Sequence, residues 1–210
     1  MITLDGSLPA EIAPLSWLLG VWEGSGVIDY RLGSADADGE HRTAEFGQRV
    51  SFSQDGGPYL SYASSTWLLP SGGSDDAPAP VRHLAETGYW RLARPLTDAD
   101  AGPGLLPGTG ERPFTTAEQV ETLRNAAGGF DIEVAIVHPT GVSELYLGHV
   151  QGPRIDLASD AVVRSSTAKD YTAATRLYGL VDSHLLWAWD MAALGQSLRT
   201  HASARLERIE

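Results

Sequence analysis

The segment Leu18-Leu19-Gly20-Val21-Trp22-Glu23-Gly24-Ser25-Gly26 is typical of the first strand of a small antiparallel β-barrel. Gly20 lets the chain turn out of a short helix formed by the apolar residues before it. Trp22 is large enough to plug one end of a barrel. Gly24 and Gly26 lie on the same side of the strand, where missing side chains permit a sharp bend or a close backbone approach.

The rest of the chain continues with strand-like patterns. Apolar residues alternate with polar ones in several runs, as at Ile132, Val134 and Ile136, which is the period of a half-buried strand. The sequence His138-Pro139-Thr140-Gly141 predicts a tight hairpin turn between two such runs. In all, ten strands are predicted, at residues 21–31, 43–53, 58–69, 82–93, 129–138, 142–150, 153–159, 171–181, 184–191 and 200–208.

Ten strands joined mostly by short turns favour an all-β fold, an antiparallel meander that closes into a barrel. Closure removes the exposed strand edges that would otherwise invite aggregation. A ten-stranded barrel is wider than one that its own side chains fill, so an internal cavity is expected.

Three segments do not fit this meander. Residues 33–42 and 70–80 are rich in Gly, Ser, Asp and Pro and are predicted to be exposed loops. Residues 95–128 form a long insertion. Within it, Thr115-Thr116-Ala117-Glu118 resembles a capping box and predicts a short helix that continues to about Asn125.

Composition places the chain among ordinary globular proteins. With 210 residues, 42% of them apolar and 20% charged, a single barrel domain over residues 1–210 is expected. The net charge of −12 argues against nucleic acid or an anionic membrane as a partner, because both would be repelled. No apolar run is long enough for a spanning helix and no signal-peptide pattern is present, so a cytoplasmic location is predicted. The sequence leaves a homodimer open.

The chain carries few of the motifs that mark common enzyme classes. It has no cysteine, which excludes disulfides, thiolate metal sites and cysteine nucleophiles. Its six histidines form no H-x-H or H-E-x-x-H pair, although a zinc site assembled from distant strands stays open. The patterns of α/β-hydrolases, P-loop enzymes and Rossmann dehydrogenases are also missing.

His201 has a setting of its own, because it follows a glycine-containing bend and begins the last predicted strand. There it could face the mouth of the barrel, among Met191, Leu194 and Leu198. A neutral histidine in apolar surroundings suits a single axial ligand of heme iron. From these residues alone, a surface or hydrogen-bonded strand histidine is the simpler interpretation.

Several ordered motifs resemble those of the nitrobindins, heme-binding relatives of the fatty-acid-binding (calycin) barrels. The resemblance runs from about residue 14 to 208. Its motifs are Gly20-x-Trp22-x-Gly24-x-Gly26, Glu86-Thr87-Gly88-Tyr89, His138-Pro139-Thr140-Gly141, Thr167-Ala168-Lys169-Asp170 with Arg176-x-Tyr178, and Met191-Ala192-Ala193-Leu194-Gly195-Gln196-x-Leu198-x-x-His201-x-x-Ala204-x-Leu206.

This resemblance implies a ferric heme b held by His201 as the proximal ligand, and an enzyme that isomerises peroxynitrite to nitrate and binds nitric oxide. It also places Lys169, the chain's one lysine, in contact with the heme beside a propionate. A solvated lysine at the start of a strand is the alternative. Gln54 stands where the family frequently has a distal histidine, and its amide would donate a hydrogen bond to a bound ligand without titrating.

Two other functions use the same barrel. A non-enzymatic carrier would bind a fatty acid or another apolar ligand, and Arg176 with Tyr178 would be available to hold its carboxylate. A nitric oxide carrier or sensor would use the same heme and the same histidine. Extraction of bound ligand separates the first from a heme enzyme, and kinetics with peroxynitrite separate the second.

Overall fold

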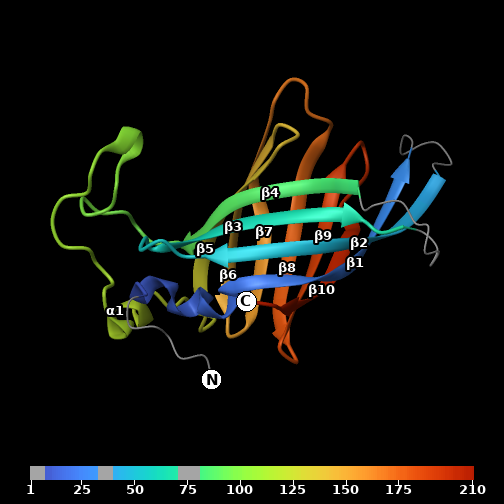
Figure 1. Cartoon of the computed structure of the whole chain (residues 1–210). Helices are drawn as coiled ribbons and strands as arrows, with labels where there is room; N and C mark the ends of the chain where they lie inside the picture. Colours follow the sequence, from blue (N-terminus) through green and yellow to red (C-terminus); the bar gives the residue numbers. More distant parts are fainter. Residues whose placement is uncertain (1–7, 33–39, 71–80) are drawn as a thin grey trace.

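The chain forms a closed ten-stranded antiparallel barrel in a computed structural model that describes residues 8–32, 40–70 and 81–210. Each strand pairs with its neighbour in sequence, and the first pairs with the last (Figure 1). The strands are β1 (Gly20–Leu32), β2 (Glu40–Ser53), β3 (Tyr59–Leu68), β4 (Val81–Leu92), β5 (Phe130–His138), β6 (Val142–Gln151), β7 (Arg154–Arg164), β8 (Tyr171–Val181), β9 (His184–Ala193) and β10 (Arg199–Arg208). The all-β barrel fold predicted from the sequence is therefore confirmed.

Every predicted strand corresponds to an observed one, and the two largest differences in extent are at β7 and β2. β7 continues to Arg164, five residues beyond the prediction, because its outer half keeps pairing with β6 up to Val142. Residues 40–42, predicted as loop, begin β2. Most of the two predicted loops, at 33–42 and 70–80, lies outside the described residues.

The short helical segment predicted before the first strand is the 3-10 helix η1 (Ala10–Leu18), which lies across one end of the barrel (Figure 1). Ile12, Leu15 and Leu18 are completely buried beneath it. Trp22 is buried at the same end, where its indole N–H donates to the Leu18 carbonyl at 2.7 Å and the Arg208 guanidinium covers its ring. These contacts close one end of the barrel.

The insertion at 95–128 extends from the same end of the barrel as η1 (Figure 1). A buried ion cluster fastens it there. The guanidinium of Arg94 donates to both carboxylate oxygens of Glu11 in η1, at 2.8 and 3.2 Å, and to those of Asp100 in the insertion, at 2.8 and 2.7 Å. Burial makes the pairing of these charges obligatory.

The helix predicted inside the insertion exists, but it is displaced and shorter. The insertion contains a 3-10 turn, η2 (Pro103–Leu105), and the helix α1 (Ala117–Glu121). The capping box uses Thr116 and Gln119, one residue later than predicted, because the Gln119 side chain reaches back to the backbone N–H of Thr116. The helix ends before Asn125, whose side chain instead closes a turn onto Gly129.

Inward-facing side chains fill much of the barrel, but the internal cavity expected from the sequence is present and has a volume of about 100 Å³. A cluster of aromatic rings occupies the half near η1, and a network of charged and hydroxyl groups lies above it. The aromatic cluster consists of Phe52, Tyr62, Trp90 and Tyr178. Among the described residues, no helix is long and apolar enough to cross a membrane.

Neighbouring strands approach the backbone closely at Gly26, as predicted for the first strand. A Cβ atom at Gly26 would lie 2.6 Å from the Phe46 ring and 2.7 Å from the Ala204 methyl, and it would overlap the Ser203 carbonyl. We expect Gly26→Ala to lower the free energy of unfolding by about 1–3 kcal/mol, as overpacking does. Gly179→Ala is the matched control, because the nearest atom to its Cβ would lie 3.8 Å away. Urea unfolding of both variants measures the difference, and equal stabilities would contradict the close approach.

Candidate functional site

His201 owes its inward orientation to a β-bulge at the start of β10. In the pairing with β9, Thr200 opposes Asp190 and Ala202 opposes Trp189, so His201 is the extra residue between them. Ala202 already faces inward, and in a regular strand its neighbour would point outward. A bulge turns such a residue, and here the half-buried His201 side chain and that of Ala202 line the same internal cavity.

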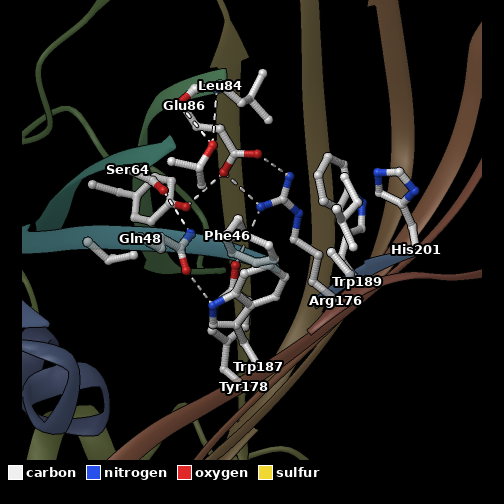
Figure 2. Close-up of a pocket in the computed structure, with 15 residues that line it drawn as sticks. Phe46, Gln48, Ser64, Leu84, Glu86, Arg176, Tyr178, Trp187, Trp189 and His201 are labelled. Carbon is white, nitrogen blue, oxygen red and sulfur yellow. Dashed lines mark hydrogen bonds and ion pairs between the residues drawn. The ribbon is translucent and has the colours of Figure 1, made fainter. Parts of the chain in front are cut away.

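This cavity lies inside the barrel, at the end opposite η1, and has a volume of about 100 Å³. Apolar and aromatic side chains make most of its wall, and several polar groups lie at its inner side (Figure 2). The residues around it include Ile28, Phe46, Gln48, Trp187, Trp189 and His201. A space of this size holds little more than a few water molecules, so a larger ligand must also use the adjoining space.

A second pocket of about 530 Å³ adjoins the first, and Leu84 and Trp189 line both. Its other walls come from the β5–β6 turn, the connection between β7 and β8, and the end of β9. They include Val142, Met191, Ala193 and Leu194, with Thr140, Thr167 and Lys169 as polar groups. We call this the mouth pocket. Its volume is in the range of small-molecule sites, and the side chain of Lys169 is exposed at its edge.

The structure does not bring Gln54 to this region. Gln54 follows the end of β2, in the turn to β3 at the η1 end of the barrel, where its amide donates to the Gly57 carbonyl at 3.0 Å. The motif residues from Gly20 to Gly26 are likewise on β1, with Trp22 at the closed end. Of the three residues predicted to bind the cofactor, His201 therefore lies at the cavity and Lys169 at the mouth pocket.

On the wall of the cavity, Arg176 and Glu86 form a buried ion pair that the sequence did not reveal. The two terminal nitrogens of Arg176 donate to the two carboxylate oxygens of Glu86 at 2.9 Å each (Figure 2). Its Nε donates to the Tyr146 hydroxyl at 3.0 Å, and Nη2 lies 3.4 Å from a Glu144 oxygen. Arg176 and both glutamates are buried.

Glu144 is the second carboxylate of this network. It accepts hydrogen bonds from the hydroxyls of Tyr146 and Tyr171, and it lies 2.6 Å from the His138 Nε2 atom. The other ring nitrogen of His138 is 3.7 Å from Glu86. These contacts join β4, β5, β6 and β8, and they leave the two carboxylates surrounded by donors.

Electrostatics keeps both carboxylates ionised. Burial raises the pKa of Glu86, but the charge and hydrogen bonds of Arg176 outweigh burial and bring that pKa down to about 2. Burial also opposes ionisation of Glu144, yet the hydrogen bond of His138 and the charge of Arg176 lower its pKa. Burial raises the pKa of Tyr62, Tyr146 and Tyr171, so that these phenols stay neutral donors.

A pattern in the sequence could have indicated this network. Glu86, Glu144 and Arg176 each lie an even number of residues from an aromatic residue that faces inward on the same strand. These aromatic residues are Trp90, four positions from Glu86, and Tyr146 and Tyr178, two positions from Glu144 and Arg176. A charged residue at an inward position requires a buried partner. The alternation identifies the individual positions, but the three-dimensional closure of the barrel determines which of them meet.

The donor set fits heme better than a bare metal ion. Within the described ranges, no group of three or more His, Cys, Asp or Glu side chains could hold a metal ion. A porphyrin supplies four of its own nitrogens and needs one axial imidazole from the protein. His201 offers that imidazole at an apolar cavity, and the mouth pocket beside it has apolar walls and a lysine at its edge.

Comparison with known proteins agrees with this donor set. The family described as "THAP4-like, heme-binding beta-barrel domain" matches residues 11–208. The chain belongs to this family. Heme is therefore the cofactor of this barrel.

Relatives of this heme-binding barrel cover its whole length. A protein of Leifsonia xyli subsp. xyli named peroxynitrite isomerase is 63% identical, and one of Clavibacter michiganensis subsp. michiganensis with the same name is 62% identical. Both alignments cover 100% of each chain. Among solved structures, that of Rv2717c from M. tuberculosis superposes with a TM-score of 0.65 at 27% identity, covering 97% of this chain and 99% of the other.

Proposed function

We propose that this protein binds heme b and isomerises peroxynitrite to nitrate, with His201 as the proximal iron ligand. The observation that carries the proposal is the β-bulge that turns His201 into an apolar cavity beside a pocket large enough for a cofactor. The full-length relatives named peroxynitrite isomerase, at 62–63% identity, supply the reaction.

The residues present suit the two parts of a heme. The apolar walls of the mouth pocket would cover the porphyrin, and His201 would hold the iron. When bound, ferric heme would supply a Lewis-acidic iron for the rearrangement of peroxynitrite. The reaction has no net proton transfer, so it requires no acid–base pair from the protein. The chain itself orients the imidazole and excludes water with aromatic and aliphatic side chains. The buried ion network of Arg176, Glu86 and Glu144 lies beside them.

The buried network of Arg176 and Glu86 also favours a heme enzyme over a fatty-acid carrier. A fatty-acid carrier would need Arg176 and Tyr178 to clamp the ligand's carboxylate, but Arg176 already binds Glu86 with both terminal nitrogens. Its Nε is committed to Tyr146. Because the protein's own carboxylates occupy this cation, we favour the heme enzyme over the carrier. Nitric oxide binding to the same heme is a further part of the proposal, and it would coexist with the isomerase.

We also propose that Lys169 pairs with a heme propionate at the edge of the mouth pocket. Replacing it by methionine should weaken hemin binding about two- to fivefold, the size expected of an exposed ion pair, and this loss should shrink at high salt. Lys169→Arg should retain most of the affinity. Arg112→Met, an exposed change in the distant insertion, is the matched control. Titrations of apoprotein with hemin measure the effect, and an affinity for Lys169→Met equal to the parent at low salt would remove the pairing.

The reaction is tested directly by stopped-flow decay of peroxynitrite in the presence of the ferric heme-loaded protein. We expect decay that accelerates in proportion to protein concentration, with nitrate as the product and little nitrite. Rapid nitric oxide binding without any acceleration of peroxynitrite decay would instead establish a carrier or sensor. A cytoplasmic location and the lack of nucleic-acid or membrane partners remain predictions that rest on composition.

A further inference from the structure

Trp189 is the side chain that lies between His201 and the buried ion network. On β9 it opposes Ala202, directly beside the bulge that carries His201. The centre of its indole ring is 5.4 Å from the centre of the His201 imidazole, and the two planes are perpendicular at 89°. This edge-to-face arrangement is a favoured geometry for aromatic pairs.

Side chains of the buried network hold the indole from its other sides. The Arg176 guanidinium lies over the ring at 4.3 Å, His138 stacks on it at 6.2 Å with an angle of 21°, and Tyr171 meets it at 6.4 Å. Figure 2 shows Trp189 standing between Arg176 and His201. Each of these partners is itself fixed by Glu86 or Glu144.

The indole nitrogen of Trp189 is buried without a hydrogen-bond partner within the described residues. By contrast, Trp187, two residues earlier on the same face, donates its N–H to Gln48 at 2.7 Å. A hydrogen bond therefore does not set the orientation of Trp189. The ring contacts to Arg176, His138 and Tyr171 do.

We propose that Trp189 is a positioning residue that fixes the plane of the His201 imidazole before heme binds. The rigid ion network holds the indole, and the indole restricts the rotation of His201, so less conformational freedom is lost when the iron is bound. The proposal rests on His201 being the iron ligand. It also gives the buried charges a role, since replacing a whole buried ion pair by well-packed apolar side chains is often neutral for stability, although removing one partner alone is costly.

A double-mutant cycle separates positioning from simple wall contact. Hemin affinity is measured for the parent and Trp189→Leu, and again for both in a His201→Gly background with imidazole supplied in solution. Losing an aromatic pair should weaken hemin binding about two- to tenfold in the His201 background. With free imidazole, which is not tethered to β10, the same change should have less than about a twofold effect.

The same loss in both backgrounds would overturn the proposal, because Trp189 would then act on the heme or the fold without His201. Trp187→Leu is the matched control. It removes a tryptophan from the same strand and cavity, and its effect should be equal in the two backgrounds. A His201→Ala protein that binds hemin as tightly as the parent would instead show that the ligand assignment itself is wrong, whatever Trp189 does.

Electron paramagnetic resonance of the ferric hemin complexes provides a readout that needs no change at His201. Trp189→Leu should broaden or split the signal, because the imidazole plane is no longer confined to one orientation. Trp189→Phe, which restores an aromatic partner, should return a single sharp signal. A Trp189→Leu spectrum identical to the parent's would overturn the proposal even if the affinity fell.

Discussion

Replacing His201 by alanine is expected to remove nearly all heme-dependent acceleration of peroxynitrite decay. His201 is the residue that the bulge in β10 turns into the cavity, whereas His138, a histidine at the mouth pocket, is held by Glu144 at 2.6 Å. Losing the axial ligand should lower hemin affinity by at least about 100-fold, since even the residues that support a metal ligand contribute 10- to 100-fold. The isomerisation rate at a fixed hemin concentration should fall with it.

His149→Ala is the control for this variant. His149 lies on β6 and is partly exposed, 3.8 Å from Asp156, and it lines neither the His201 cavity nor the mouth pocket. Its removal should leave hemin affinity and the rate unchanged. Stopped-flow kinetics and a Soret titration measure both quantities on the same samples. A His201→Ala protein with parental kinetics would exclude His201 as the ligand.

The second large effect is on stability, at Arg176. Replacing it by leucine leaves Glu86 and Glu144 buried without their guanidinium, and breaking a buried ion pair in this way costs about 3–5 kcal/mol. Arg154→Leu is the matched control, because Arg154 binds Asp156 with two hydrogen bonds at 2.7 Å but is exposed. That change should cost no more than about 1 kcal/mol. Urea unfolding of the apoproteins compares them.

The pH dependence of stability gives the same ion pair a distinctive signature. The folded-state pKa of Glu86 is about 2, below its value of 4.5 in the unfolded chain. Because this pKa is depressed, ionised Glu86 adds to the free energy of unfolding above about pH 4.5. That contribution is lost as the pH falls toward 2. In Arg176→Leu, burial without the guanidinium should raise the pKa of Glu86 instead. Lowering the pH from 4.5 toward 2 should then no longer remove this part of the free energy of unfolding. Unchanged acid sensitivity of the variant would contradict the assignment.

Much of the fold could be predicted because strands are encoded locally. Alternation and turn residues gave all ten strands, and the apolar segment before Gly20 gave the closing helix. Errors occurred where local signals compete. The capping box was displaced by one residue because both Thr115 and Thr116 are suitable caps, and only the structure shows that Gln119 selects Thr116.

The site was predicted less completely, because its parts depend on long-range geometry. His201 was predicted from its position after a glycine-containing bend and from family resemblance. No sequence pattern predicts the β-bulge that turns it inward. Gln54 was predicted from the family resemblance to lie at a distal position, although the turn that contains it lies at the η1 end of the barrel. Arg176 and Glu86 are 90 residues apart in sequence, so only closure of the barrel brings them together.

The central claim, that His201 holds one heme in this barrel, is tested most directly by titrating the apoprotein with hemin. We expect a Soret band that saturates at one hemin per chain and whose saturation is lost in His201→Ala. A band that never saturates in the parent protein, or one that saturates equally in the variant, would contradict the account.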